Sequence, residues 1–122
     1  MRRSLFAGLM LLALATSVHA STPTLPTPLN LVPLNVATVT TGGTAAVAVL
    51  AGNKTAGGWI QNPTGAAAAL CIDEIDTAVG TTSSGNTTCI SAGTIYTMTP
   101  SIGSVTVISS DSAHAFSGMS FK

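Results

Sequence analysis

Short β-prone segments alternate with Gly, Asn and Pro along most of this chain, and this punctuation constrains the fold more than any other feature. Most of these segments are rich in Val, Ile, Thr or aromatic residues and end close to a turn-forming residue. Short strands with regular turn signals are typical of an all-β sandwich or partial barrel. The expected strands are Val36–Thr40, Ala45–Ala51, Trp59–Gln61, Ala67–Asp73, Thr88–Ile90, Thr94–Met98, Val105–Ser109 and Ala115–Phe121.

One segment has a helical composition instead. Gly65–Leu70 contains a run of alanine, which is the best helix former. The run is too short to nucleate a helix alone, and β-branched residues dominate its surroundings. We therefore predict a small β-sandwich over residues 35–122, immunoglobulin-like or jelly-roll-like, with about seven or eight short strands and one disulfide.

Residues 1–20 have the pattern of a secretory signal peptide. Arg2 and Arg3 give a positive start, Leu5–Thr16 is an apolar run, and Val18–Ala20 is a small-residue cleavage site. The apolar run is shorter than the roughly 20 residues that cross a bilayer, so no membrane span is expected in the mature form. We predict an exported protein, periplasmic or extracellular, that begins at Ser21.

Residues 21–34 are expected to form a Pro-rich extended arm. Proline at this density blocks helices and central strands, so we expect Ser21–Pro33 to form no central strand and its removal to cost no internal ladder. Two alternatives stay open: a flexible leader, or an arm that docks through its apolar side chains in cis or in trans. The prolines are Pro23, Pro26, Pro28 and Pro33, and the apolar side chains are Leu25, Leu29, Leu31, Val32 and Leu34.

Few charges remain once residues 1–20 are removed. The mature chain has a net charge of −2, from Lys54 and Lys122 against Asp73, Glu74, Asp76 and Asp111. Without a basic patch, binding to nucleic acid through phosphate neutralisation is excluded. Binding to a membrane surface through basic residues is excluded for the same reason.

The two cysteines, Cys71 and Cys89, are expected to form a disulfide because an exported chain folds in an oxidising compartment. Two thiols alone are too few ligands for a metal site. Side chains alternate between the two faces of a strand. Leu70 and Ile72 are therefore expected on the face that Cys71 does not occupy, and Ile90 on the face that Cys89 does not occupy. We therefore predict a disulfide between adjacent strands, with the three aliphatic side chains on the core side.

The large aromatic side chains are interpreted as core packing rather than as a ligand platform. They are Trp59, Tyr96, Phe116 and Phe121.

Asp73, Glu74 and Asp76 form an acidic cluster at the end of the fourth expected strand. The stretch does not match a calcium-binding loop, and a glycosidase carboxylate pair would need a cleft with aromatic side chains. We interpret the cluster as a solvated turn, and we expect no bound metal and no cofactor.

His114 follows Ser110, Asp111 and Ser112, so the residue types of a catalytic triad lie close together. Triad partners normally come from separate elements, and the sequence has no G-x-S-x-G motif. We therefore interpret residues 109–112 as a turn in which Asp111 caps backbone amides, and His114 as the beginning of the last strand. No catalytic, cofactor-binding or metal-binding residue is predicted.

Several turn and strand segments together carry a family resemblance: Val39–Ala45, Gly57–Pro63, Leu70–Glu74, Ala92–Tyr96 and Val105–Phe116. In these segments the chain resembles small all-β proteins encoded in bacterial phage and prophage regions, often near virion structural genes. The resemblance implies an all-β fold and a structural role. This chain departs from the pattern in its signal peptide, and in Cys71 and Cys89, which replace aromatic or aliphatic cross-strand partners.

The expected function is that of a secreted, non-enzymatic structural or assembly protein. It would pack against copies of itself or against another protein at a cell or particle surface. The alternative is an extracellular module that binds carbohydrate or another surface ligand through loops at one end of the sandwich. Sugar binding would favour an exposed aromatic pair beside polar side chains, for which Trp59 and Tyr96 are the candidates.

Overall fold

The computed structural model describes residues 27–75, 77–78 and 85–122, and within them it contains ten short strands and no helix. The all-β class predicted from the sequence is confirmed. The strands are β1 (Leu31–Pro33), β2 (Thr38–Val39), β3 (Ala46–Val49), β4 (Gly58–Gln61), β5 (Leu70–Asp73), β6 (Thr88–Ile90), β7 (Ile95–Met98), β8 (Val105–Ile108), β9 (His114–Ala115) and β10 (Ser117–Phe121).

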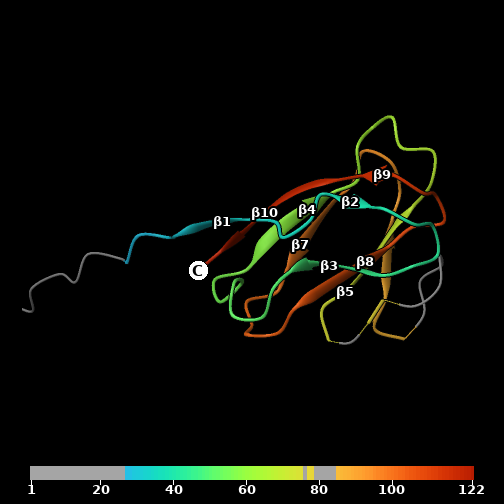
Figure 1. Cartoon of the computed structure of the whole chain (residues 1–122). Coiled ribbons are helices and arrows are strands. Elements are labelled where there is room, and N and C mark those ends of the chain that lie inside the picture. The colour runs from blue at the N-terminus through green and yellow to red at the C-terminus, as the bar shows by residue number, and fades with distance from the viewer. Residues whose placement is uncertain (1–26, 76, 79–84) are drawn as a thin grey trace, which may run out of the picture.

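The strands form two four-stranded antiparallel sheets and one two-stranded ladder (Figure 1). The first sheet has the order β1-β10-β4-β7, and the second has the order β3-β8-β5-β6. Strands β2 and β9 pair with each other. Each sheet therefore mixes strands from distant parts of the chain, which is the arrangement of a sandwich.

A single apolar core lies between the two sheets. Ile60 and Met98 of the first sheet are buried in one cluster with Val105 and Val107 of the second. The predicted inward face of β5 and β6 is confirmed, because the same cluster contains Leu70, Ile72 and Ile90. Alternation along each strand thus directs the aliphatic side chains of both sheets toward each other.

The disulfide between Cys71 and Cys89 is confirmed. The two residues lie directly opposite each other on β5 and β6. They point away from the core and pack with Ala78 and Ile108 in a second, smaller apolar cluster. The disulfide therefore joins the two strands on the outer face of the second sheet.

The outer face of the second sheet is covered by the chain itself. Ala78, in the connection that leaves β5, is 2% exposed, and its amide donates to Thr106 Oγ1 of β8 at 2.7 Å. As a result every residue of β5 and β8 is buried, on both faces of the sheet. The second sheet therefore has no free face over these strands.

The first sheet gains an edge strand from the N-terminal arm, so the arm docks in cis and forms no central strand, but the expectation that it contributes no internal ladder is wrong. Strand β1 pairs with β10, with Leu31 opposite Phe121 and Pro33 opposite Met119 (Figure 1). Proline is excluded from central strands only, and β1 lies at the sheet edge, where a missing amide costs no ladder bond. Residues 1–26, including the predicted signal peptide, lie outside the described residues.

The last expected strand is divided at Phe116. Its first part, β9, pairs with β2, whereas β10 pairs with β4 and β1. Phe116 itself is 4% exposed in the core, and its amide donates to the carbonyl of Ala37. The division occurs because the chain changes partners at this buried aromatic residue.

Replacing both cysteines, as Cys71→Ala with Cys89→Ala, is expected to lower the free energy of unfolding by about 2–4 kcal/mol, because the unfolded chain gains freedom. Urea unfolding of the two proteins measures the difference. Intact mass after alkylation of the unreduced wild type provides the control. Two alkylated cysteines in that sample would contradict the disulfide.

Candidate functional site

The outer face of the first sheet keeps apolar side chains open to solvent. Strand register places Pro33, Met119, Trp59 and Thr97 in one row across all four strands. We call this surface the outer face; its side chains are Leu31, Pro33, Trp59, Gln61, Ile95, Thr97, Ser117, Met119 and Phe121, and none of them is charged.

Several apolar side chains of the outer face are open to solvent. Leu31 is 62% exposed and Ile95 is 56% exposed. Trp59, Met119 and Phe121 are only partly buried. Strands β5 and β8, in contrast, are buried on both faces. The exposure of the outer face therefore involves several residues on different strands and not a single side chain.

Two of the four aromatic residues expected in the core lie on the outer face instead. Ile60 and Ser120 occupy the inward positions of β4 and β10, so their neighbours Trp59 and Phe121 point outward. Phe116 is in the core as expected, and Tyr96 packs against it.

Trp59 and Tyr96 lie on opposite faces of the first sheet. Trp59 is paired with Thr97, and Tyr96 is paired with Ile60 on the core side. The exposed aromatic pair that sugar binding would favour is therefore not formed.

A buried ion pair joins the two sheets at one end of the sandwich. Lys54 follows β3 and is 0% exposed. Its ammonium donates to Glu74 Oε2 at 2.7 Å, to the carbonyl of Thr99 at 3.0 Å and to the hydroxyl of Ser101. All three ammonium hydrogens therefore have acceptors, and the amine is held as a structural cation.

The carboxylate of Glu74 is equally well bound. It accepts the Tyr96 hydroxyl at 2.7 Å and the Thr99 amide at 3.0 Å, besides the Lys54 ammonium. Because Glu74 follows β5 and Tyr96 belongs to β7, the carboxylate connects the second sheet to the first. Its contact with Thr99 also covers a backbone amide just after the edge strand β7.

The expectation that the acidic cluster is a solvated turn is wrong for Asp73 and Glu74. Asp73 is 2% exposed and accepts the Ile75 amide at 2.8 Å and the Thr87 hydroxyl at 3.1 Å. Spacing along the sequence could not show this burial, because every partner except the nearby Ile75 amide comes from a distant segment. Asp76 lies outside the described residues.

The network shifts two pKa values in opposite directions. Burial alone raises the pKa of Glu74, but hydrogen bonds from Lys54, Tyr96 and Thr99 outweigh it and hold the pKa below its ordinary value of 4.5. Burial and the hydrogen bond to the Glu74 carboxylate raise the pKa of Tyr96 above its ordinary 10.0. Glu74 is therefore ionised and Tyr96 neutral over the physiological range, which suits a fixed structural network.

A second polar cluster lies around His114. Its Nε2 atom is 2.9 Å from Asn62 Oδ1, and the Asn62 amide group donates to the carbonyls of Ala68 and Ile90. His114 is 6% exposed and begins β9, as the sequence predicts. The cluster connects the end of β4 to β6 and β9.

The turn before His114 is capped by serine hydroxyls rather than by Asp111. Ser112 Oγ accepts the Gly42 amide at 3.0 Å, and Ser109 Oγ accepts the Asp111 amide at 3.4 Å. The expected capping role of Asp111 is therefore wrong, because its neighbours satisfy these amides. The turn ends at Ala113, which has a positive φ of 55°.

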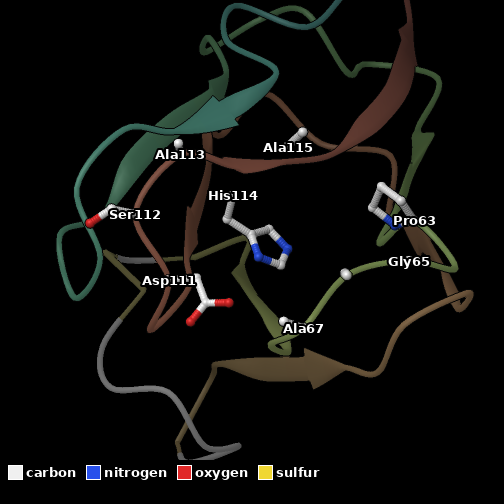
Figure 2. Close-up of a pocket in the computed structure, with 9 residues that line it drawn as sticks. Pro63, Gly65, Ala67, Asp111, Ser112, Ala113, His114 and Ala115 are labelled. Atoms are coloured by element: carbon white, nitrogen blue, oxygen red, sulfur yellow. The ribbon is translucent and has the colours of Figure 1, made fainter.

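The turn and the segment after β4 line an open hollow of about 280 Å³. Figure 2 shows the His114 ring and the Asp111 carboxylate reaching into this hollow, across from Pro63, Gly65 and Ala67. A further hollow of about 320 Å³ lies beside Glu74 and Tyr96. Ser112 faces the Gly42 amide and not His114, so the triad geometry is not assembled.

No family model matches the sequence, and no curated protein or solved structure matches it either. The resemblance to small phage-encoded β proteins therefore stays a prediction. Across residues 27–75, 77–78 and 85–122, no helix is long and apolar enough to cross a membrane. In the same ranges no group of three or more His, Cys, Asp or Glu side chains is placed to hold a metal ion.

Lys54→Met is expected to lower the free energy of unfolding by about 3–5 kcal/mol, because it leaves the Glu74 carboxylate buried beside no cation. The matched control is the double variant Lys54→Met with Glu74→Met, which removes both charges. Urea unfolding of the single and double variants forms a double-mutant cycle. A double variant as unstable as the sum of the two single variants would contradict the coupling.

Ala113→Gly is expected to raise the free energy of unfolding by about 1 kcal/mol, because glycine adopts a positive φ without a clash of Cβ. Thermal unfolding measures the change. Ala115→Gly is the control: Ala115 lies in β9 and has no positive φ, so glycine there is expected to destabilise. Equal effects of the two substitutions would show that Ala113 stores no strain.

Proposed function

We propose that this chain is an exported, non-enzymatic structural protein whose outer face packs against a second copy of the chain. One observation carries the proposal: the two central strands of the second sheet are buried on both faces, whereas the outer face of the first sheet has apolar side chains open to solvent. Strands β5 and β8 are fully buried, whereas the outer face exposes Leu31 and Ile95. Open apolar sheet faces of this kind are typical of interaction surfaces.

The absence of charge on the outer face favours a second copy as the partner. In a two-fold dimer the same surface meets itself, so a charge near the two-fold axis would face its own copy across the interface. The outer face instead offers Trp59, Met119 and Phe121 at its centre and Gln61, Thr97 and Ser117 around them. Aromatic and methionine side chains with a polar surround are the composition of interface cores.

Export supports this role. Residues 1–20 predict a signal peptide, and the Cys71–Cys89 disulfide is compatible with an oxidising compartment. Outside the cytoplasm the disulfide would keep β5 and β6 of the second sheet joined, while the outer face of the first sheet binds a second copy of the chain. Assembly at a cell or particle surface is the setting in which such a protein would work.

Carbohydrate binding is the second candidate, and Trp59 is the observation in its favour. Trp59 is partly exposed and lies on the same face as Gln61 and Thr97, whose polar groups can bind hydroxyls. Self-packing is preferred because Tyr96 is on the other face and its hydroxyl is bound to Glu74.

Thr97→Lys is expected to abolish self-association, because each copy would bring an unpaired lysine into an otherwise uncharged interface. Sedimentation velocity on the exported protein measures the change. Thr41→Lys, in an exposed turn away from the outer face, is the matched control and is expected to associate like the wild type.

A wild-type protein that stays monomeric at high concentration would overturn the self-packing proposal. In that case, quenching or enhancement of Trp59 fluorescence by soluble polysaccharides would support the second candidate. Trp59 is the single tryptophan of the chain, so the signal needs no assignment.

A further inference from the structure

One ring nitrogen of His114, Nδ1, has no hydrogen-bond donor among the described residues. Asn62 donates both amide hydrogens, to the carbonyls of Ala68 at 3.0 Å and of Ile90 at 3.1 Å. Its oxygen must therefore accept, and the only hydrogen available at 2.9 Å is that of His114 Nε2. The neutral ring then has its hydrogen on Nε2, which leaves Nδ1 as an acceptor.

This acceptor opens into the hollow. His114 is 94% buried as a residue, yet it is one of the side chains that line the hollow. Figure 2 shows the second ring nitrogen on the side of Asp111, away from the segment that includes Pro63. Among the described residues, none donates a hydrogen bond to Nδ1.

The carboxylate of Asp111 is a second acceptor on the same hollow. No described residue donates to this carboxylate, and it forms no ion pair with His114. The one ion pair within the described ranges is that of Lys54 with Glu74, at the other hollow. The hollow at His114 therefore presents a negative charge and a neutral acceptor with no cation of its own.

The remaining walls are small and apolar. Pro63, Gly65, Ala66, Ala67 and Ala115 line the hollow, and its volume of about 280 Å³ exceeds what a single ion or water needs. Ala113, which has a positive φ, lies between Asp111 and His114 in the sequence, and the chain turns at this residue. Backbone strain of this kind is found where a turn presents side chains to a ligand.

We propose that this hollow binds a small alkylammonium ion, with the ammonium group on Asp111 and His114 Nδ1 and the alkyl chain against the alanine and proline wall. An ammonium group provides hydrogens for both acceptors and a positive charge for the carboxylate. An anion would face Asp111 unfavourably. A transition metal would find only these two protein ligands, which is fewer than protein metal sites supply.

The test uses three probes of nearly equal size and different charge: n-butylammonium, n-butanol and butyrate. Each is titrated into ¹⁵N-labelled protein, and the amide signals of residues 111–115 and the His114 ring nitrogens are followed. We expect n-butylammonium alone to bind and to shift Nδ1 while Nε2 stays protonated. Asp111→Asn is expected to weaken its binding about tenfold.

Two further variants separate charge from shape. Ala67→Leu keeps both acceptors and fills the hollow, so it is expected to remove binding. Ser110→Ala changes an exposed neighbour of Asp111 without touching either acceptor, and is expected to bind like the wild type. Amide spectra of all three variants report whether the fold is kept.

Equal binding of n-butanol and n-butylammonium would overturn the proposal, since the hollow would then select only apolar chains. Unchanged affinity in Asp111→Asn would overturn it as well, because the carboxylate would not contact the ligand. Binding of none of the three probes to the wild type would show that the hollow is not a site for this class of ligand.

Discussion

The buried pair of Lys54 and Glu74 is the interaction on which the rest of the sandwich depends. It connects the turn after β3, the end of β5 and the end of β7, so it fixes how the two sheets meet at one end. At the His114 hollow, Asn62 connects β4 to β6 and β9 through its carbonyl and imidazole contacts. The apolar core lies between these two polar clusters, and the Lys54–Glu74 cluster satisfies the hydrogen-bonding groups of its own charged members.

This arrangement explains why the two sheets can differ so much on their outer faces. The second sheet is closed by its disulfide and by the connection that buries Ala78. The first sheet is stabilised at its edge by β1 and on its inner face by the apolar core. The packing of the sandwich therefore does not depend on the outer face of this sheet. A surface that stability does not require can be kept apolar and uncharged for binding.

The sequence was sufficient for the elements that depend on local pattern. The period of two and the turn residues predicted most strands, the facing of Leu70, Ile72 and Ile90, and the Cys71–Cys89 bond. Features that depend on distant partners could not be predicted. In the sequence Lys54 is a single lysine in a polar turn, and only the fold brings it to Glu74. Trp59 is of a residue type common in cores, but Ile60 occupies the inward position of β4, so Trp59 points outward.

Acrylamide quenching of Trp59 fluorescence, measured over a range of protein concentrations, tests the central claim most directly. Trp59 is the one tryptophan and lies in the middle of the outer face. Packing of that face against a second copy predicts that the quenching constant falls as the protein associates. A quenching constant that stays the same while sedimentation shows a growing oligomer would place the interface elsewhere and contradict the account.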